Sequence, residues 1–261
     1  MPFKKASSFT YPPRLVVSVE GLDATGKTHF PFGAPRPLYL FNIDAGLEGM
    51  MQEPGKFDLA RVYVSDFALS KPVALTQSDA VEQALAVAKR FIEEFREKLR
   101  KEKRITLAVD TASEFWELFR LGDLGKLEQV PPMRYTKVNR MWRGMMLEVF
   151  QTPHNLILIH RLKDKYESKM VNGKEVSTRV AGELERVGFK ETDYVVQVSI
   201  RCWRKVRQKE GPRKGQPLFG FTVIKCRQRA SLMGKTFVGD TASFKGLAMA
   251  VFPESTEEDW T

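Results

Sequence analysis

Long apolar stretches are absent from this sequence. Its apolar runs, such as residues 156–159, are far shorter than the roughly 20 residues that a membrane-spanning helix needs. The N-terminus also lacks the apolar stretch of a secretory signal. We therefore expect a chain that makes no membrane contact and stays in the cytoplasm.

Cysteine and histidine are scarce. The 261 residues include two cysteines, Cys202 and Cys226, and neither has a cysteine or histidine partner at metal-ligand spacing. This excludes a cysteine-rich metal site, and we interpret both residues as buried free thiols.

Acidic residues are in the minority. The sequence has 42 Lys and Arg against 32 Asp and Glu, for a net charge of +10. Such an excess indicates a polyanion partner, although a solvated loop on a basic protein explains any single charge run equally well. Seven basic residues lie close together: Arg201, Arg204, Lys205, Arg207, Lys209, Arg213 and Lys214.

The pattern of apolar residues predicts one α/β core. Apolar runs at residues 14–20, 37–43, 105–110 and 155–160 are typical of buried strands, and residues 79–101 and 135–150 have helical periodicity. Asp79 and Glu82 resemble a capping pair. This alternation predicts a mostly parallel sheet flanked by helices on both faces.

The two ends of the chain differ from this core. Residues 1–13 have little periodicity and predict an N-terminal arm, the core domain spans 14–252, and the acidic residues 253–261 predict a mobile tail. Runs at 194–203 and 218–225 enclose the basic stretch 208–217, which predicts a β-hairpin with a charged tip. The C-terminal part is therefore expected to be rich in β-structure.

A glycine-rich loop follows the first predicted strand. Residues 21–28 match the pattern G-x-x-x-x-G-K-[ST] in its usual context after an apolar strand. Its backbone N–H groups wrap a phosphate, Lys27 reaches the β and γ phosphates, and Thr28 supplies a ligand to Mg²⁺. A chance turn before a helix is the alternative. The predicted site for ATP and Mg²⁺ comprises Gly21, Leu22, Asp23, Ala24, Thr25, Gly26, Lys27, Thr28 and His29.

Carboxylates follow two other predicted strands. Asp110 ends the strand at 105–110, where a carboxylate that holds Mg²⁺ is typical, and its alternative role is to cap the next helix. Asp44 and Glu48 follow the strand at 37–43, and neighbouring strand ends of a parallel sheet face one crevice. We expect one of these two residues to orient the attacking water. The alternative is a turn at Asp44 with a surface glutamate, which we prefer for Glu48 alone.

Three further polar residues end predicted strands. His160 is either a sensor of the γ-phosphate, or a relay toward DNA, or a capping or surface histidine. Lys225 and Arg227 end a late strand, where they either meet the phosphates of a neighbouring subunit, as arginine fingers do, or form a plain basic strand end.

The spacing after the glycine-rich loop points to a family. Only eight residues separate Thr28 from Pro37, so the helix after the loop must be very short. This arrangement, followed by Asn-Ile-Asp-Ala-Gly-Leu at residues 42–47, resembles the RecA-type core of phage-encoded ATPases related to RadA and the Sak-type single-strand annealing proteins. The resemblance spans residues 14–230. It implies an ATPase that acts with Mg²⁺ on single-stranded DNA in recombination or replication, in the cytoplasm of a phage host.

The same resemblance implies roles for individual residues. Asp44 falls where the family has a water-activating glutamate and is one methylene shorter, so that hydrolysis is slow or Glu48 substitutes. Asp110 matches the Walker B acid, and His160 matches the polar residue that ends the next strand.

The resemblance also implies an assembly. Lys225 and Arg227 match a Lys-x-Arg pair that acts across subunits, and a finger acting on a neighbour requires a head-to-tail ring or filament. Phe3 and Ala6 have the Phe-x-x-Ala form by which RadA-type recombinases hook onto the next subunit. Other recombination or replication proteins are further expected partners.

Two alternatives stay open. Residues 19–28 also resemble the opening of thymidylate kinases, which are nucleoside monophosphate kinases, but the longer helix and the Asp-Arg-aromatic motif of those enzymes are not found here. The second alternative is a nucleotide-binding assembly module with little turnover. If DNA is the partner, we expect residues 201–214 to contact its backbone, with Trp203 and Tyr166 as stacking residues, although core packing explains Trp203 better.

Overall fold

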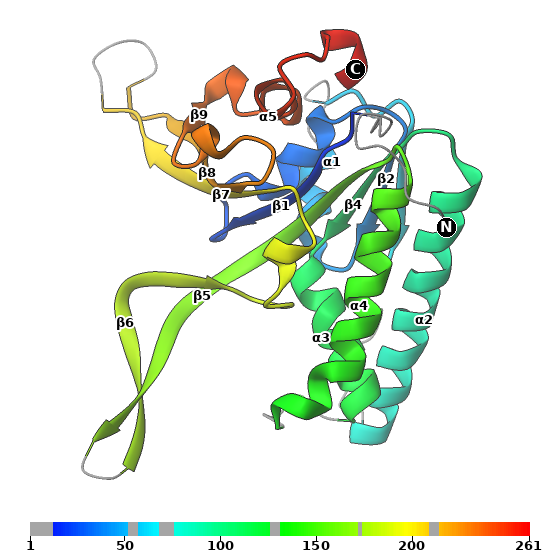
Figure 1. The fold of residues 1–261 in the computed structure, drawn as a ribbon, viewed down its shortest axis with the longest axis vertical. Helices are drawn as coiled ribbons and strands as arrows, with labels where there is room; N and C mark the ends of the chain where they lie inside the picture. Colours follow the sequence, from blue (N-terminus) through cyan, green and yellow to red (C-terminus); the bar gives the residue numbers. More distant parts are fainter. Residues whose placement is uncertain (1–12, 52–56, 68–75, 126–130, 172–173, 209–213) are drawn as a thin grey trace, which may run out of the picture.

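The strands form one sheet with a parallel centre. The computed structural model describes residues 13–51, 57–67, 76–125, 131–171, 174–208 and 214–261. Its strands are β1 (Val16–Gly21), β2 (Leu38–Asn42), β3 (Val62–Asp66), β4 (Thr106–Asp110), β5 (Asn155–Val171), β6 (Lys174–Arg186), β7 (Val198–Val206), β8 (Pro217–Cys226) and β9 (Thr236–Val238). The order is β3-β2-β4-β5-β1-β7-β8-β9, with β6 paired to β5 (Figure 1). The neighbours β3, β2, β4, β5, β1 and β7 run parallel to one another, whereas β8 is antiparallel to β7 and β9 is antiparallel to β8.

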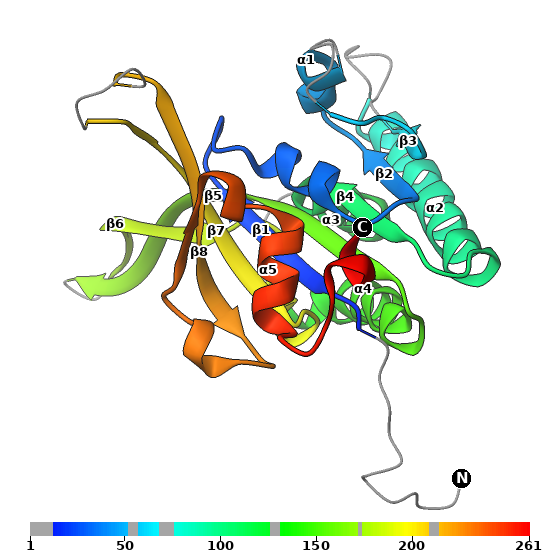
Figure 2. The same cartoon turned by 90° about the horizontal axis from the view of Figure 1, so that it is seen from above.

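Helices cover both faces of this sheet (Figure 2). The α-helices are α1 (Glu48–Met51), α2 (Gln77–Lys101), α3 (Ala112–Leu124), α4 (Thr136–Glu148) and α5 (Phe244–Val251). Apolar residues of α2, α3 and α4 pack on one face, and α5 packs on the other together with the 3-10 helix η2 (Lys27–Gly33). The predicted fold class is therefore confirmed: a mostly parallel α/β sheet flanked by helices, with a β-rich C-terminal part.

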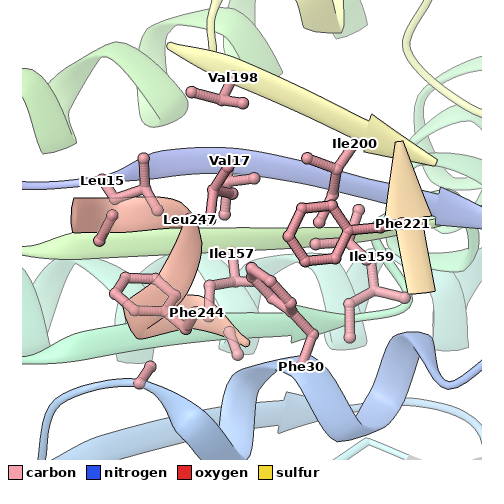
Figure 3. Close-up of a cluster of buried hydrophobic side chains, with 14 of the residues drawn as sticks. Leu15, Val17, Phe30, Ile157, Ile159, Val198, Ile200, Phe221, Phe244 and Leu247 are labelled. Atoms are coloured by element: carbon pink, nitrogen blue, oxygen red, sulfur yellow. The ribbon is translucent and has the colours of Figure 1, made fainter. Parts of the chain in front are cut away.

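Alternation along the central strands fills both cores. Val17 and Ile157 point toward η2 and α5, where Phe30 and Phe244 pack on them (Figure 3). Their neighbours in sequence point to α2, α3 and α4 instead, because successive side chains of a strand face opposite sides. Apolar contact on both faces explains why these strands appear as continuous apolar runs in the sequence.

The N-terminus of α2 differs from its prediction. The capping residue is Thr76, whose hydroxyl accepts a hydrogen bond from the backbone N–H of Asp79, and the Asp79 carboxylate accepts one from the Thr76 N–H. The predicted pair of Asp79 and Glu82 is therefore wrong, since Asp79 is the return partner of a capping box rather than the cap.

The helix after the glycine-rich loop is very short, as predicted. It is η2, seven residues long, with Pro31 inside it. Proline lacks the N–H that would continue a helical hydrogen-bond ladder. Phe30 and Phe32 of η2 itself are buried in the core, so η2 anchors the loop.

The fourth predicted strand does not end at His160. β5 continues to Val171 and pairs with β6 in an antiparallel ribbon that extends away from the sheet (Figure 1). We call residues 162–171 and 174–186 the β5–β6 arm. Charged side chains on the arm pair across the strands, as Lys165 does with Glu183 at 2.8 Å. Because the arm has no continuous apolar face, its sequence has no strand-like alternation.

The C-terminal residues are not the mobile tail that we predicted. Trp260 is 1% exposed and stacks on Phe252 with ring centroids 5.6 Å apart. Arg104 donates a hydrogen bond to the backbone carbonyl of Asp259 at 2.8 Å. Burial of the indole therefore holds this acidic segment against the core.

Three further points concern single features of the sequence. Cys202 and Cys226 are buried and unpaired, as predicted. No helix in the described part of the chain is both long enough and apolar enough to cross a bilayer. Phe3 and Ala6 lie outside the described residues.

Candidate nucleotide-binding site

The glycine-rich loop turns sharply between β1 and η2. Gly26 has a φ of 85°, in the left-handed region that favours glycine, and Ala24 also has a positive φ of 55°. The Lys27 ammonium donates a hydrogen bond to the carbonyl of Leu22 at 2.7 Å, and the hydroxyl of Thr25 donates to the same carbonyl. The Lys27 side chain is therefore folded back over the preceding residues of the loop.

Carboxylates of three segments surround Lys27. Burial lowers the pKa of Lys27, and the charges of Asp23, Asp110 and Asp44 oppose this effect. Two of these carboxylates come from other strand ends, since Asp110 ends β4 and Asp44 follows β2. The structure thus brings together residues that are up to 87 positions apart in sequence.

Asp110 is buried beside Thr28. Burial raises the pKa of Asp110 to about 7 and the charge of Asp44 adds to this, whereas a hydrogen bond from Thr28 acts in the opposite direction. The Oδ2 atom of Asp110 has no hydrogen-bond partner among the described residues. Thr111, not Asp110, caps α3 by accepting a hydrogen bond from Glu114 N–H. The capping alternative for Asp110 is therefore wrong.

These residues fit a magnesium ion. A buried carboxylate oxygen without a partner, next to a threonine hydroxyl, is a hard oxygen donor set of the kind Mg²⁺ prefers. The described residues contain no cluster of three Asp, Glu, His or Cys side chains that suits a metal. Mg²⁺ commonly takes most of its ligands from phosphate oxygens and water.

Asp44 has both a local and a longer-range interaction. Its Oδ1 atom accepts a hydrogen bond from Gly46 N–H at 2.8 Å, which is the turn that we considered as its alternative role. Its charge nevertheless affects the pKa of both Asp110 and Lys27. Asp44 is thus within electrostatic reach of the loop. Glu48 begins α1, but its side chain lies outside the described part of the structure.

His160 is buried at the same edge of the sheet. It lies opposite Glu20 in the register of β5 and β1, and it is 1% exposed, so it is not a surface histidine. Neither ring nitrogen has a partner among the described residues. Burial lowers the pKa of His160 well below its usual value, with the Arg186 charge adding to the shift. The ring is therefore neutral at pH 7.

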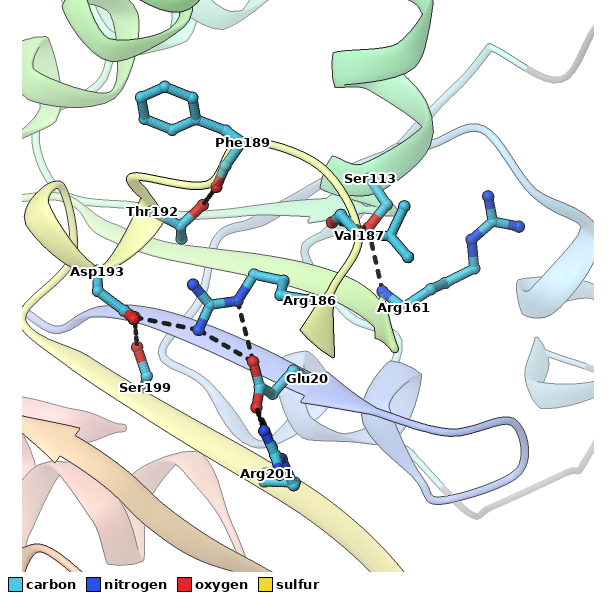
Figure 4. A network of polar contacts seen from close by, with 10 residues as sticks. All are labelled: Glu20, Ser113, Arg161, Arg186, Val187, Phe189, Thr192, Asp193, Ser199 and Arg201. Carbon is cyan, nitrogen blue, oxygen red and sulfur yellow. Dashed lines mark hydrogen bonds and ion pairs between the residues drawn. The ribbon is translucent and has the colours of Figure 1, made fainter. Parts of the chain in front are cut away.

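An ion-pair network that we did not predict lies beside the loop (Figure 4). The buried Glu20, which precedes Gly21, binds Arg201 of β7 at 2.6 Å and Arg186 of β6 at 3.0 Å. Arg186 also reaches Asp193 at 3.1 Å. A glutamate inside an apolar strand was the only sequence signal, and it does not identify its partners.

Lys225 and Arg227 lie away from the loop of their own chain. Arg227 N–H bonds to the carbonyl of Gln197, whose own N–H bonds to Val16 at the start of β1, whereas the loop follows the end of β1. Both side chains donate hydrogen bonds to the carbonyl of Asp193. Within one chain they therefore do not contact the predicted phosphate site.

Comparisons with known proteins identify no family. No family model matches the chain, and no curated protein does. Several solved structures resemble the chain, among them a prototypical ATPase from the type III secretion system of pathogenic bacteria, which aligns with 72% of this chain at 12% identity and a TM-score of 0.46. The chain spans 50% of the length of that protein.

Proposed function

We propose that this protein binds a nucleoside triphosphate with Mg²⁺ at the loop of residues 21–28 and hydrolyses it. One observation carries the proposal: Lys27, Thr28 and Asp110 meet at the edge of the sheet where the loop leaves β1. A half-buried lysine, a hydroxyl and a buried carboxylate in this arrangement suit a triphosphate and its cation.

Each residue has a distinct part in this proposal. Backbone N–H groups of the loop hold the phosphates, and Lys27 exchanges the Leu22 carbonyl for phosphate oxygens. Thr28 and Asp110 hold Mg²⁺, which, when bound, neutralises charge on the phosphates. Asp44 orients the attacking water. It suits this role because its charge acts on both Asp110 and Lys27.

The test is hydrolysis by a lysine variant. Lys27→Ala removes the cation that meets the β and γ phosphates, so we expect the rate of phosphate release to fall about 100-fold or more. Lys103→Ala, at an exposed lysine, is the matched control and should leave the rate unchanged. Full activity of the Lys27→Ala protein would refute the site.

A finer proposal concerns the partner and the assembly. The protein acts on single-stranded DNA as a RecA-like ATPase of the phage RadA and Sak-type kind, in a ring or filament. Arg204 and Lys205 support this, because they are exposed on β7 beyond the end of β1, and Lys205 lies over the Trp203 ring at 5.0 Å. Arg201 belongs to the Glu20 network instead, so it is not part of this basic surface.

The two alternatives predict different assays. The short η2 disfavours a thymidylate-like kinase, which needs a longer helix after the loop. The Asp44 side chain, which is bound in a local turn, favours a nucleotide-binding module with little turnover. Transfer of phosphate to deoxythymidine monophosphate would support the kinase, and ATP binding without hydrolysis would support the module.

A further inference from the structure

A pocket of about 350 Å³ opens beside the glycine-rich loop, on the side of β8. Thr25, Gly26 and His29 of the loop and of η2 form part of its wall. This places it on the other side of β1 from Asp110, because β7 and β8 lie on one side of β1, and β5 and β4 lie on the other. Five phenylalanines, Phe30, Phe32, Phe57, Phe219 and Phe221, line the rest of the wall together with small and polar residues that include Gly220, Asp240 and Ser243.

The aromatic residues form a floor and a rim. Phe30, Phe32 and Phe221 are buried and belong to the core, so the floor is rigid. His29 meets Phe57 edge to face at the rim, with ring centroids 5.4 Å apart. Phe219 is 41% exposed, an unusual position for a large apolar side chain next to a polar loop.

Phe219 touches the loop itself. A Cβ atom on Gly26 would lie 3.4 Å from its ring, which is van der Waals contact. A ligand whose phosphates bind at residues 26–28 can therefore extend past the ring of Phe219 into this pocket. A group that fills the part lined by phenylalanine rings must be flat and largely apolar.

We propose that this pocket binds the base of the nucleoside triphosphate and that Phe219 is its stacking residue. A nucleobase has the required flat face, and stacking on an aromatic side chain tolerates different bases. The inference rests on the proposed function, because the phosphate loop sets the position of the ligand. It adds that the protein recognises a nucleotide rather than a bare polyphosphate.

The experiment compares two ligands and three variants by titration calorimetry. Mg²⁺-ATP carries a base, and Mg²⁺-tripolyphosphate carries only the phosphates. Phe219→Ala removes the stacking ring, Phe219→Trp replaces it with another ring, and Ile224→Ala truncates a 42% exposed residue of the same strand outside the pocket. Thermal unfolding of each variant checks that the protein is folded.

We expect ATP to bind wild-type protein at least about tenfold more tightly than tripolyphosphate, because stacking contributes to ATP alone. Phe219→Ala should weaken ATP about tenfold and leave tripolyphosphate unchanged, Phe219→Trp should retain ATP affinity, and Ile224→Ala should change neither. If Phe219→Ala does not fold, Phe219→Leu removes the ring but keeps an apolar side chain, and the same two affinities are compared.

The remaining outcomes separate this inference from the proposed function. Equal affinity of wild-type protein for the two ligands would overturn the base pocket and leave triphosphate binding intact. Equal weakening of both ligands in Phe219→Ala would also overturn it, since the ring would then support the loop rather than a base. Failure of wild-type protein to bind either ligand would instead refute the proposed function.

Discussion

At the scale of single residues, ionisation of Asp110 opposes folding. Its carboxyl group is buried, with a pKa raised to about 7, while the unfolded chain keeps the ordinary value near 3.8. Between these two values the folded state binds more protons than the unfolded state, so this residue lowers stability as the pH rises. Above the folded pKa the full penalty applies, and a bound cation offsets it.

A substitution of Asp110 tests this penalty. In metal-free buffer at pH 8, Asp110→Asn should raise the free energy of unfolding by about 2 kcal/mol or more, because a neutral amide replaces a buried charge. At pH 5 the gain should be clearly smaller, since Asp110 in the folded protein is then already protonated. Urea unfolding at the two pH values measures both quantities.

The control is Asp240→Asn, at an exposed carboxylate. It should change stability little at either pH. A gain from Asp110→Asn that was equal at pH 5 and pH 8 would contradict the account of this carboxylate.

At the scale of elements, Glu20 joins three strands of distant sequence. It lies on β1 and holds Arg186 of β6 and Arg201 of β7. Arg186 has a side chain only 11% exposed, so removal of Glu20 leaves a buried cation without its closest carboxylate. The network thus fixes the base of the β5–β6 arm next to the phosphate loop.

A pair of glutamate variants separates this buried network from surface charge. Glu20→Ala should lower the free energy of unfolding by about 3–5 kcal/mol, which is typical when one partner of a buried pair is removed. Glu183→Ala breaks the exposed pair with Lys165 and should lower stability far less, because surface ion pairs contribute little. Similar decreases in urea unfolding of both variants would show that Glu20 does not have this role.

Sequence patterns predicted elements better than the pairing of their side chains. The strands ending at Gly21, Asn42 and Asp110 were predictable because each is apolar on both faces. The β5–β6 arm was missed because its strands mix charged and polar residues without a regular apolar alternation, although Asn172-Gly173 is a typical hairpin turn signal. The pairing of Glu20 with Arg186 joins residues 166 positions apart, and no local pattern encodes it.

At the scale of the whole molecule, the exposed cations of two regions differ in their ion pairing. On the β5–β6 arm, cations pair with carboxylates, as Lys163 does with Glu185 and Arg179 with Asp164. Tyr166, a predicted stacking residue, lies on this arm and is 56% exposed. The β7–β8 hairpin instead carries exposed Arg204 and Lys205 beside the nucleotide site. A polyanion should therefore bind the β7–β8 hairpin in preference to the arm.

Charge reversal on the hairpin tests the proposed DNA-binding surface. Changing Arg204, Lys205 and Arg207 to Glu should weaken single-stranded DNA binding. It should also flatten the dependence of log affinity on log salt by about 0.7 for each phosphate that the protein no longer neutralises. Fluorescence anisotropy over a range of salt concentrations measures both effects.

An equal charge change elsewhere is the control. Reversal of three exposed cations outside the hairpin, Lys89, Arg100 and Lys103, alters net charge by the same amount and should leave the salt slope unchanged. If the two triple variants behaved alike, net charge rather than the β7–β8 hairpin would account for DNA binding.

The most direct test of the central claim is steady-state release of phosphate from ATP by the purified protein. Wild-type protein and the Lys27→Ala variant are compared with and without Mg²⁺ and single-stranded DNA, and deoxythymidine monophosphate serves as a trial acceptor. We predict release that requires Mg²⁺ and Lys27 and rises with DNA. Release that persists without Lys27, or phosphate that appears on the nucleotide acceptor, would contradict the account.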